Sequence, residues 1–254
     1  MPIRPANTPG IQASACMLAL LAFTGNALAT DPEIMVHEND IAERGELVAT
    51  LHANYTARGS RQSGDTTWPS DKLTNLMAEF ATGIAPAWEI GIHLPIMRAG
   101  VNSESSTAGS WGSSGIMLRL KHIQEWENGL FLGFNAEYDV YAQRFATDNR
   151  SVELRGILGL DAEHYRLTLN PALMWGLGSR VDEHAPNFSL SGKALYKYTE
   201  QWGFGAELYS NWGAANNLLP GDGDRLAYLI GEWSPDERHS LHFGFGKGFK
   251  NTPE

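Results

Sequence analysis

The sequence has little of three things, and each shortage excludes a class of protein. Its only cysteine is Cys16, so the chain cannot close a disulfide within itself. Its longest apolar run, residues 15–23, falls far short of the roughly 20 apolar residues that a membrane-spanning helix needs. Lysine and arginine (19) are outnumbered by aspartate and glutamate (29), and a net charge of -10 argues against a surface that binds nucleic acid. We therefore expect no nucleic-acid partner.

Motifs for catalysis and metal binding are also missing. No G-x-S-x-G nucleophile elbow occurs, and the 8 histidines show neither the H-x-H nor the H-x-x-x-H spacing of metal ligands. The motif GDGD at residues 221–224 lacks the downstream glutamate of a calcium loop. Some outer-membrane barrels hydrolyse lipids with serine and histidine, and His122, His164 and His239 are the candidate histidines for such a reaction. A lipid hydrolase is the least favoured of the functions considered below. We expect no enzyme, no cofactor and no bound metal.

The N-terminus has the parts of a secretory signal peptide. Arg4 precedes the apolar run of residues 15–23, and Ala27 and Ala29 give the small-x-small spacing of a signal-peptidase site. A single-helix anchor is disfavoured because the run is too short. Cys16 lies at the start of the run rather than after it, so no lipid attachment is expected. We predict a signal peptide over residues 1–29, cleavage after Ala29, and a separate N-terminal segment, residues 30–44.

Alternation of apolar and polar residues is the strongest pattern in the rest of the chain. In GELVATLHANYTAR, residues 45–58, Leu47, Leu51 and Tyr55 fall on one face, whereas His52 falls on the other. Successive side chains of a strand point to opposite faces, so this period of two predicts a strand. Ten more runs of strand length follow: residues 74–84, 87–97, 115–123, 130–142, 151–160, 165–177, 188–198, 202–212, 225–233 and 240–249.

The connections between these runs alternate between short and long. Residues 85–87 and 161–164 are short, whereas residues 59–73 and 100–114 are longer and rich in glycine and serine. A soluble β-sandwich also hides one strand face. Alternating turn lengths, with aromatic residues at the ends of the apolar face, are instead typical of outer-membrane barrels. The predicted fold is all-β, an up-and-down antiparallel transmembrane β-barrel over residues 45–254 with about twelve strands, eleven of them clear.

Several stretches of the chain carry a resemblance to a known family. They combine spaced glycine, proline and aromatic residues: LNPAL (169–173), PNFSLSGKALYKY (186–198), GFGAELYSNWG (203–213), LHFGFGKGF (241–249), EIGIHLPIM (89–97) and SVELRGILG (151–159). In these the chain resembles poorly characterised bacterial outer-membrane barrels, often labelled transporters or phenol-degradation MetA-pathway proteins. The resemblance spans most of the mature chain and implies a barrel without a catalytic set.

One difference from that family concerns how the barrel closes. Its members continue past the GxGxGF strand into a final strand that ends in an aromatic residue, whereas this chain stops at KNTPE, residues 250–254. If the short turns are periplasmic, the first and eleventh strands both run outward, although antiparallel bacterial barrels have an even number of strands. Either EIMVHEND, residues 33–40, supplies a twelfth strand or the final strand is missing, and the sequence leaves both open.

Function is expected on the face that points into the barrel. The candidate lumen-lining residues are His52, Glu79, Glu89, His93, Arg119, Lys121, Asn135, Glu137, Asp139, Glu153, Arg155, Arg166, Lys193, Lys197 and Glu207, together with Asn170 and His242. Acidic and basic members nearly balance, which favours ion pairs that fill a narrow barrel over selection of one kind of ion.

Two functions fit such an interior. The first is a passive channel for small molecules, and the family label together with lumen-side Phe131, Tyr141 and Tyr209 favours aromatic or hydrophobic ones. The second is a non-conducting structural or interaction barrel, which the balanced charges favour. The expected location is the cell outer membrane. The expected partners are its lipid, a small-molecule solute, and the periplasmic chaperones and barrel assembly machinery that act during insertion.

Overall fold

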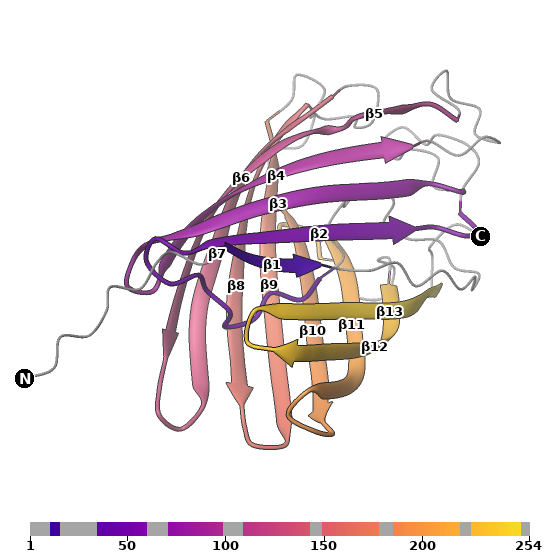
Figure 1. Cartoon of the computed structure of the whole chain (residues 1–254). Helices are drawn as coiled ribbons and strands as arrows, with labels where there is room; N and C mark the ends of the chain where they lie inside the picture. Colours follow the sequence, from indigo (N-terminus) through magenta and orange to yellow (C-terminus); the bar gives the residue numbers. More distant parts are fainter. Residues whose placement is uncertain are drawn as a thin grey trace, which may run out of the picture.

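The protein is built from β-strands alone in the part of the chain that is described. A computed structural model describes residues 11–15, 35–59, 71–98, 109–142, 149–177, 185–218 and 225–249. Within these ranges no residue belongs to a helix long and apolar enough to cross a membrane. Figure 1 shows the strands side by side in one sheet that curls round on itself. The predicted all-β, up-and-down antiparallel fold is confirmed.

Eleven long strands and two short ones make up the sheet. Their bounds are β1 Ile11–Ala15, β2 Leu47–Tyr55, β3 Thr74–Ala85, β4 Trp88–Arg98, β5 Trp111–Ser113, β6 Gly115–Glu125, β7 Leu130–Tyr141, β8 Arg150–Asp161, β9 Tyr165–Gly176, β10 Asn187–Lys197, β11 Trp202–Ala214, β12 Arg225–Asp236 and β13 His239–Phe249. From β2 to β13 each long strand pairs antiparallel with the next, and β5 pairs with β4 beside this path. The eleven long strands coincide with the eleven runs of alternating residues.

The short turns gather at one end of the sheet and require particular residues. Gly129, between β6 and β7, has a φ of 80°, a left-handed conformation that other residues rarely adopt. A Cβ atom at this position would also collide with the carbonyl oxygen of Asp161 on the neighbouring strand β8. Most residues of the long links, including GDGD, lie outside the described ranges.

The sheet has its polar side chains inside and its apolar side chains outside. Leu47, Leu51 and Tyr55 of β2 are exposed, at 41%, 46% and 46%, whereas His52 between them is 7% exposed. The same division recurs around the sheet: Asn170 of β9 is buried while Leu167 and Leu169 are exposed, and Lys193 of β10 is buried while Tyr196 is exposed. A soluble sandwich has the opposite arrangement, because it buries apolar faces between its two sheets.

The two ends of the sheet face each other across a seam. Strands β2 and β13 both run from the short-turn end to the long-link end, and no ladder joins them among the described residues. Between them lies β1, which pairs parallel with the first five residues of β2 (Figure 1). Because β1 falls within the predicted signal peptide, cleavage after Ala29 would remove it from the seam. That cleavage stays a prediction.

Residues 35–40 are not the twelfth strand that the sequence offered as one alternative. They form an irregular segment whose residues Val36, His37 and Glu38 are buried. The remaining two residues of that proposed strand, 33 and 34, lie outside the described ranges. These residues form no strand because side chains on the inner face of the sheet, rather than the backbone of a strand edge, form the hydrogen bonds with their backbone groups.

Candidate functional site

The candidate site is the interior of the curled sheet together with the segment Met35–Arg44 that crosses it. This segment, called the inner segment below, bonds to residues of β4, β6, β9 and β10, which are far from it in sequence. It enters beside the middle of β9 and leaves at the short-turn end, where Arg44 forms an isolated parallel bridge with Gly83 of β3. The interior is therefore occupied by the chain itself.

Asn170 of β9 binds the main chain of the inner segment. His37 donates its backbone N–H to Asn170 Oδ1 at 2.7 Å, and Asn170 Nδ2 donates to the carbonyl oxygen of His37 at 3.0 Å. Asn170 is completely buried and His37 is nearly so. The side-chain amide thus replaces the backbone hydrogen bonds that a neighbouring strand would form with this segment. Both buried backbone groups of His37 therefore have a partner.

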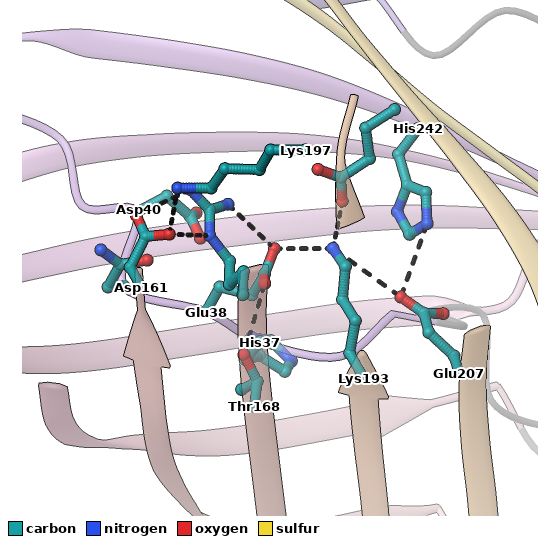
Figure 2. A network of polar contacts seen from close by, with 12 residues as sticks. His37, Glu38, Asp40, Asp161, Thr168, Lys193, Lys197, Glu207 and His242 are labelled. Carbon is teal, nitrogen blue, oxygen red and sulfur yellow. Dashed lines mark hydrogen bonds and ion pairs between the residues drawn. The ribbon is translucent and has the colours of Figure 1, made fainter. Parts of the chain in front are cut away.

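Lys193 of β10 is the centre of the ion pairs drawn in Figure 2. Its Nζ atom lies 2.7 Å from Glu38 Oε2, forms a short contact with Glu232 of β12, and lies 4.0 Å from Glu207 Oε1 of β11. His242 of β13 approaches the same Glu207 oxygen at 3.5 Å. One buried ammonium therefore connects the inner segment to two strands of the barrel wall.

Two more wall residues hold the Glu38 carboxylate. Thr168 Oγ1 donates to Glu38 Oε1 at 3.3 Å, and Arg166 Nη1 lies 3.5 Å from Oε2. Arg166 is also paired through two nitrogens with Asp161, at 3.1 Å each. Lys197, the last residue of β10, also pairs with Asp161, with its Nζ atom 2.5 Å from Oδ1. The network in Figure 2 thus extends from the inner segment to the short-turn rim of the sheet.

The second half of the inner segment meets Lys121 and Glu89. Lys121 Nζ donates to the carbonyl oxygen of Asp40 at 2.6 Å and lies 3.3 Å from its Oδ2 atom. The Lys121 ammonium holds the pKa of the Asp40 carboxyl at about 2, below its usual 3.8. Ala42 donates its backbone N–H to Glu89 Oε2 at 2.7 Å. Both halves of the segment are therefore bound by charged groups of the wall.

A second group of charges lies on β2, β3, β4 and β6. Glu79 approaches His52 Nε2 at 3.0 Å, His93 Nε2 at 3.6 Å and Arg119 Nη2 at 2.5 Å. Arg119 Nη2 also lies 2.6 Å from Glu89 Oε1, and all five side chains are buried. Because Glu89 accepts the hydrogen bond from Ala42, this group is continuous with the inner segment.

Gly83 of β3 lets the inner segment lie close to the wall. A Cβ atom at Gly83 would collide with the carbonyl oxygens of Ala42 and Glu43. At Gly192 of β10 the nearest atoms to an added Cβ are Thr168 O at 3.3 Å and Leu169 Cδ1 at 3.5 Å, so a shift of a few tenths of an ångström would accommodate the methyl group. The two glycines offer a matched pair of substitutions.

We predict that Gly83→Ala displaces the inner segment from the wall while the barrel still folds. The displacement can be measured as the rate at which a water-soluble maleimide labels Val36→Cys in a Cys16→Ser background, because Val36 is 1% exposed. The rate should rise several-fold with Gly83→Ala and stay unchanged with Gly192→Ala. Equal rates in the two variants would contradict the proposed close packing at Gly83.

The other candidate residues are placed along the inner face in smaller pairs. Asn135 donates to Glu137 at 2.5 Å, Ser151 donates to Asp139 at 2.8 Å, and Arg155 Nε donates to Glu153 at 2.7 Å. Asn135 and Asp139 are buried, whereas Glu153 and Arg155 are half-buried. Sequence reasoning missed Glu38, Asp40 and Glu232 because two of them lie outside any strand pattern. The only available signal was the charged HEND between apolar Val36 and Ile41.

Of the three catalytic alternatives, His122 and His164 do not line the interior cavity, whereas His239 lies at its edge in the β12–β13 turn. His122 bonds the Ala87 carbonyl at 2.7 Å, while His164 and His239 are exposed beside Glu163 and Asp236. Among the described residues no group of three or more metal-ligating side chains is placed to hold an ion. The expectations of no enzyme and no metal stay predictions.

A cavity of about 550 Å³ lies between the inner segment and the seam strands β2, β12 and β13. Nine carboxylates line it, against four lysine or arginine side chains and three histidines. The balance of charge expected for the whole interior therefore does not hold here, because the inner segment and the β12–β13 turn add acids. Phe131, proposed for the lumen, packs against Ile123 and Ile157 and does not line this cavity.

No protein-family model and no curated protein matches this chain. The resemblance to the phenol-degradation MetA-pathway barrels stays a prediction from the sequence. What can be argued about function comes from the geometry of the sheet, the inner segment and the cavity.

Proposed function

We propose that this chain is an outer-membrane β-barrel, closed at rest by its inner segment, that passes small solutes when the segment moves aside. The observation that supports the membrane location is the apolar outer face. Leu51, Leu94 and Leu229 on different strands are 46%, 43% and 73% exposed, while the inner face is polar and buried. In water such a surface would be far larger than the apolar patches of soluble monomers. Lipid would cover this apolar surface, and the polar side chains would stay inside the barrel, away from the lipid.

Aromatic residues at the short-turn end support the same proposal. Trp202, the first residue of β11, stacks on Trp233 with ring centroids 5.8 Å apart, and Tyr165, the first residue of β9, lies 5.4 Å from Tyr196. Such rings favour a membrane–water boundary because one part is apolar and another can hydrogen-bond. The predicted signal peptide would supply the export step, and periplasmic chaperones and the barrel assembly machinery would supply insertion.

The proposed membrane location leads to a prediction about fractionation and gel mobility. The mature protein should fractionate with outer membranes and should migrate faster on gels before boiling than after, because a closed barrel resists detergent until it is heated. Gel mobility with and without heating, on separated membrane fractions, measures both properties. Recovery of the protein in the soluble periplasm after osmotic shock would contradict the proposal.

The occupied interior favours a second candidate, a non-conducting structural barrel. The inner segment is held at both halves, by Lys193 and Asn170 and by Lys121 and Glu89. The cavity beside it nevertheless leaves space for a solute of modest size. Whether the solute is aromatic or hydrophobic stays a prediction, since Phe131 packs in an apolar cluster and Tyr209 donates its hydroxyl proton to Glu207 at 2.7 Å.

Conductance in planar bilayers separates the two candidates. We predict rare openings for the unaltered chain and frequent discrete openings for Gly83→Ala, because that substitution removes the space in which the inner segment packs. Gly192→Ala should behave as the unaltered chain does. Silence of Gly83→Ala, with the segment shown by labelling to be displaced, would reject the channel and favour the structural barrel.

A further inference from the structure

We infer that the barrel interior is a binding site for an acidic peptide, and that residues Met35–Ile41 occupy it as a tethered ligand. A site of this kind can bind a separate peptide of the same chemistry. The inference requires a folded barrel but no ion or solute conduction, so it goes beyond the proposed function.

Among the described residues, two buried side chains of the wall have their partners on the inner segment alone. Lys121 is 1% exposed, and Asp40 is its one partner for side-chain hydrogen bonds and ion pairs among the described residues. Asn170 is 0% exposed, and within the described ranges the polar atoms of its side chain bond only to the main chain of His37. A buried ammonium or amide without a partner is costly. The wall is therefore complementary to a peptide that brings these partners to it.

Part of the recognition is independent of peptide sequence. Asn170 binds both backbone groups of His37, and Lys121 binds the carbonyl oxygen of Asp40. These contacts require a main chain in the conformation of the inner segment, bent at Asn39, in which the backbone groups of His37 and Asp40 point to the wall. Any peptide in that conformation can form them.

The rest of the recognition selects an acidic peptide with apolar residues on either side. Glu38 and Asp40, two residues apart, each meet a buried lysine, at 2.7 Å from Lys193 and 3.3 Å from Lys121. Val36 is 1% exposed, and Ile41 packs against the cluster of Ile123, Phe131 and Ile157. The favoured ligand is therefore an apolar residue, two acids at alternate positions, and a second apolar residue, as in MVHENDI.

The test uses the full chain with substitutions that weaken binding of the inner segment to the wall and leave the wall residues unchanged. Glu38→Gln with Asp40→Asn removes both acids of the inner segment, so a free peptide MVHENDI with an N-terminal fluorescent label can compete for the wall. Fluorescence anisotropy of the labelled peptide with the purified protein in detergent measures binding. A tethered segment acts at an effective concentration near millimolar, so the unaltered chain should bind the peptide at least about tenfold more weakly than this double variant.

Two matched controls identify the contacts. The peptide MVHQNNI, without either acid, should bind the double variant at least about tenfold more weakly than MVHENDI does, because it leaves Lys121 without a charged partner. Adding Lys121→Met to the double variant should weaken binding of MVHENDI by a similar factor. Heat-modifiable migration of each variant shows that the barrel is folded.

Either of two results would overturn the inference: no binding of MVHENDI to the folded double variant, or equal binding of MVHENDI and MVHQNNI. Peptide binding by a protein that stays silent in bilayers would leave the inference intact and reject the channel. Conduction by Gly83→Ala without peptide binding by the double variant would reject the inference and support the channel.

Discussion

Replacing Leu51 by arginine is expected to destabilise the inserted barrel by about 2 to 4 kcal/mol, whereas arginine at the neighbouring Thr50 should cost much less. Leu51 is 46% exposed on the outer face and is the fifth of the nine residues of β2, so it should lie near the midplane of the bilayer. A charged group at that depth loses its hydration without gaining a partner.

Thr50 is a close control because it is the residue next to Leu51 in β2 and its side chain points to the opposite, inner face of the sheet. It lines the interior cavity, and in the ladder between β2 and β3 it lies opposite Glu79. An arginine there would meet a carboxylate and water rather than lipid. Urea unfolding of the two variants in lipid vesicles, followed by tryptophan fluorescence, gives the free energy of unfolding. Equal losses at the two positions would reject the assignment of faces and, with it, the membrane proposal.

The strands of this protein could be predicted because period-two alternation is a local property. The run of residues 74–84 became β3 Thr74–Ala85, and the run of residues 115–123 became β6 Gly115–Glu125. The faces followed as well, since Glu79 and His93 were both assigned to the inner face and are paired across β3 and β4 in the structure. Alternation also explains why the leucines of these strands form one continuous outer surface.

The inner segment could not be predicted in the same way. It has no period, and its partners are distant in sequence, 133 residues away for His37 with Asn170 and 155 for Glu38 with Lys193. Alternation predicts no element other than a strand, so the sequence offers EIMVHEND only the role of a twelfth strand. That an acid such as Glu38 pairs inside the barrel depends on the curvature of the whole sheet, which no short stretch of sequence contains.

The interior charges have a consequence for stability that centres on Arg119. Its Nη2 atom lies between Glu79 Oε1, at 2.5 Å, and Glu89 Oε1, at 2.6 Å. Arg119, Glu79 and Glu89 are 7%, 5% and 4% exposed. A single guanidinium therefore pairs with two buried carboxylates, one of which, Glu79, also contacts His52 and His93. Replacing a whole buried ion-pair group by apolar residues can be neutral, but removing one partner leaves the other charges uncompensated.

Arg119→Met is accordingly expected to lower the free energy of unfolding by about 3 to 5 kcal/mol, the cost of leaving buried charges without a partner. Arg238→Met, at an exposed position in the turn between β12 and β13, removes the same charge from the chain and should change stability by less than about 0.5 kcal/mol. Adding Glu79→Gln and Glu89→Gln to Arg119→Met should recover much of the loss, because the uncompensated charges are then gone. Unfolding in denaturant from lipid vesicles measures all three proteins. If Arg119→Met unfolds at the same denaturant concentration as Arg238→Met, water or the neighbouring His52 and His93 compensate the carboxylates, and Arg119 is not the group that stabilises them.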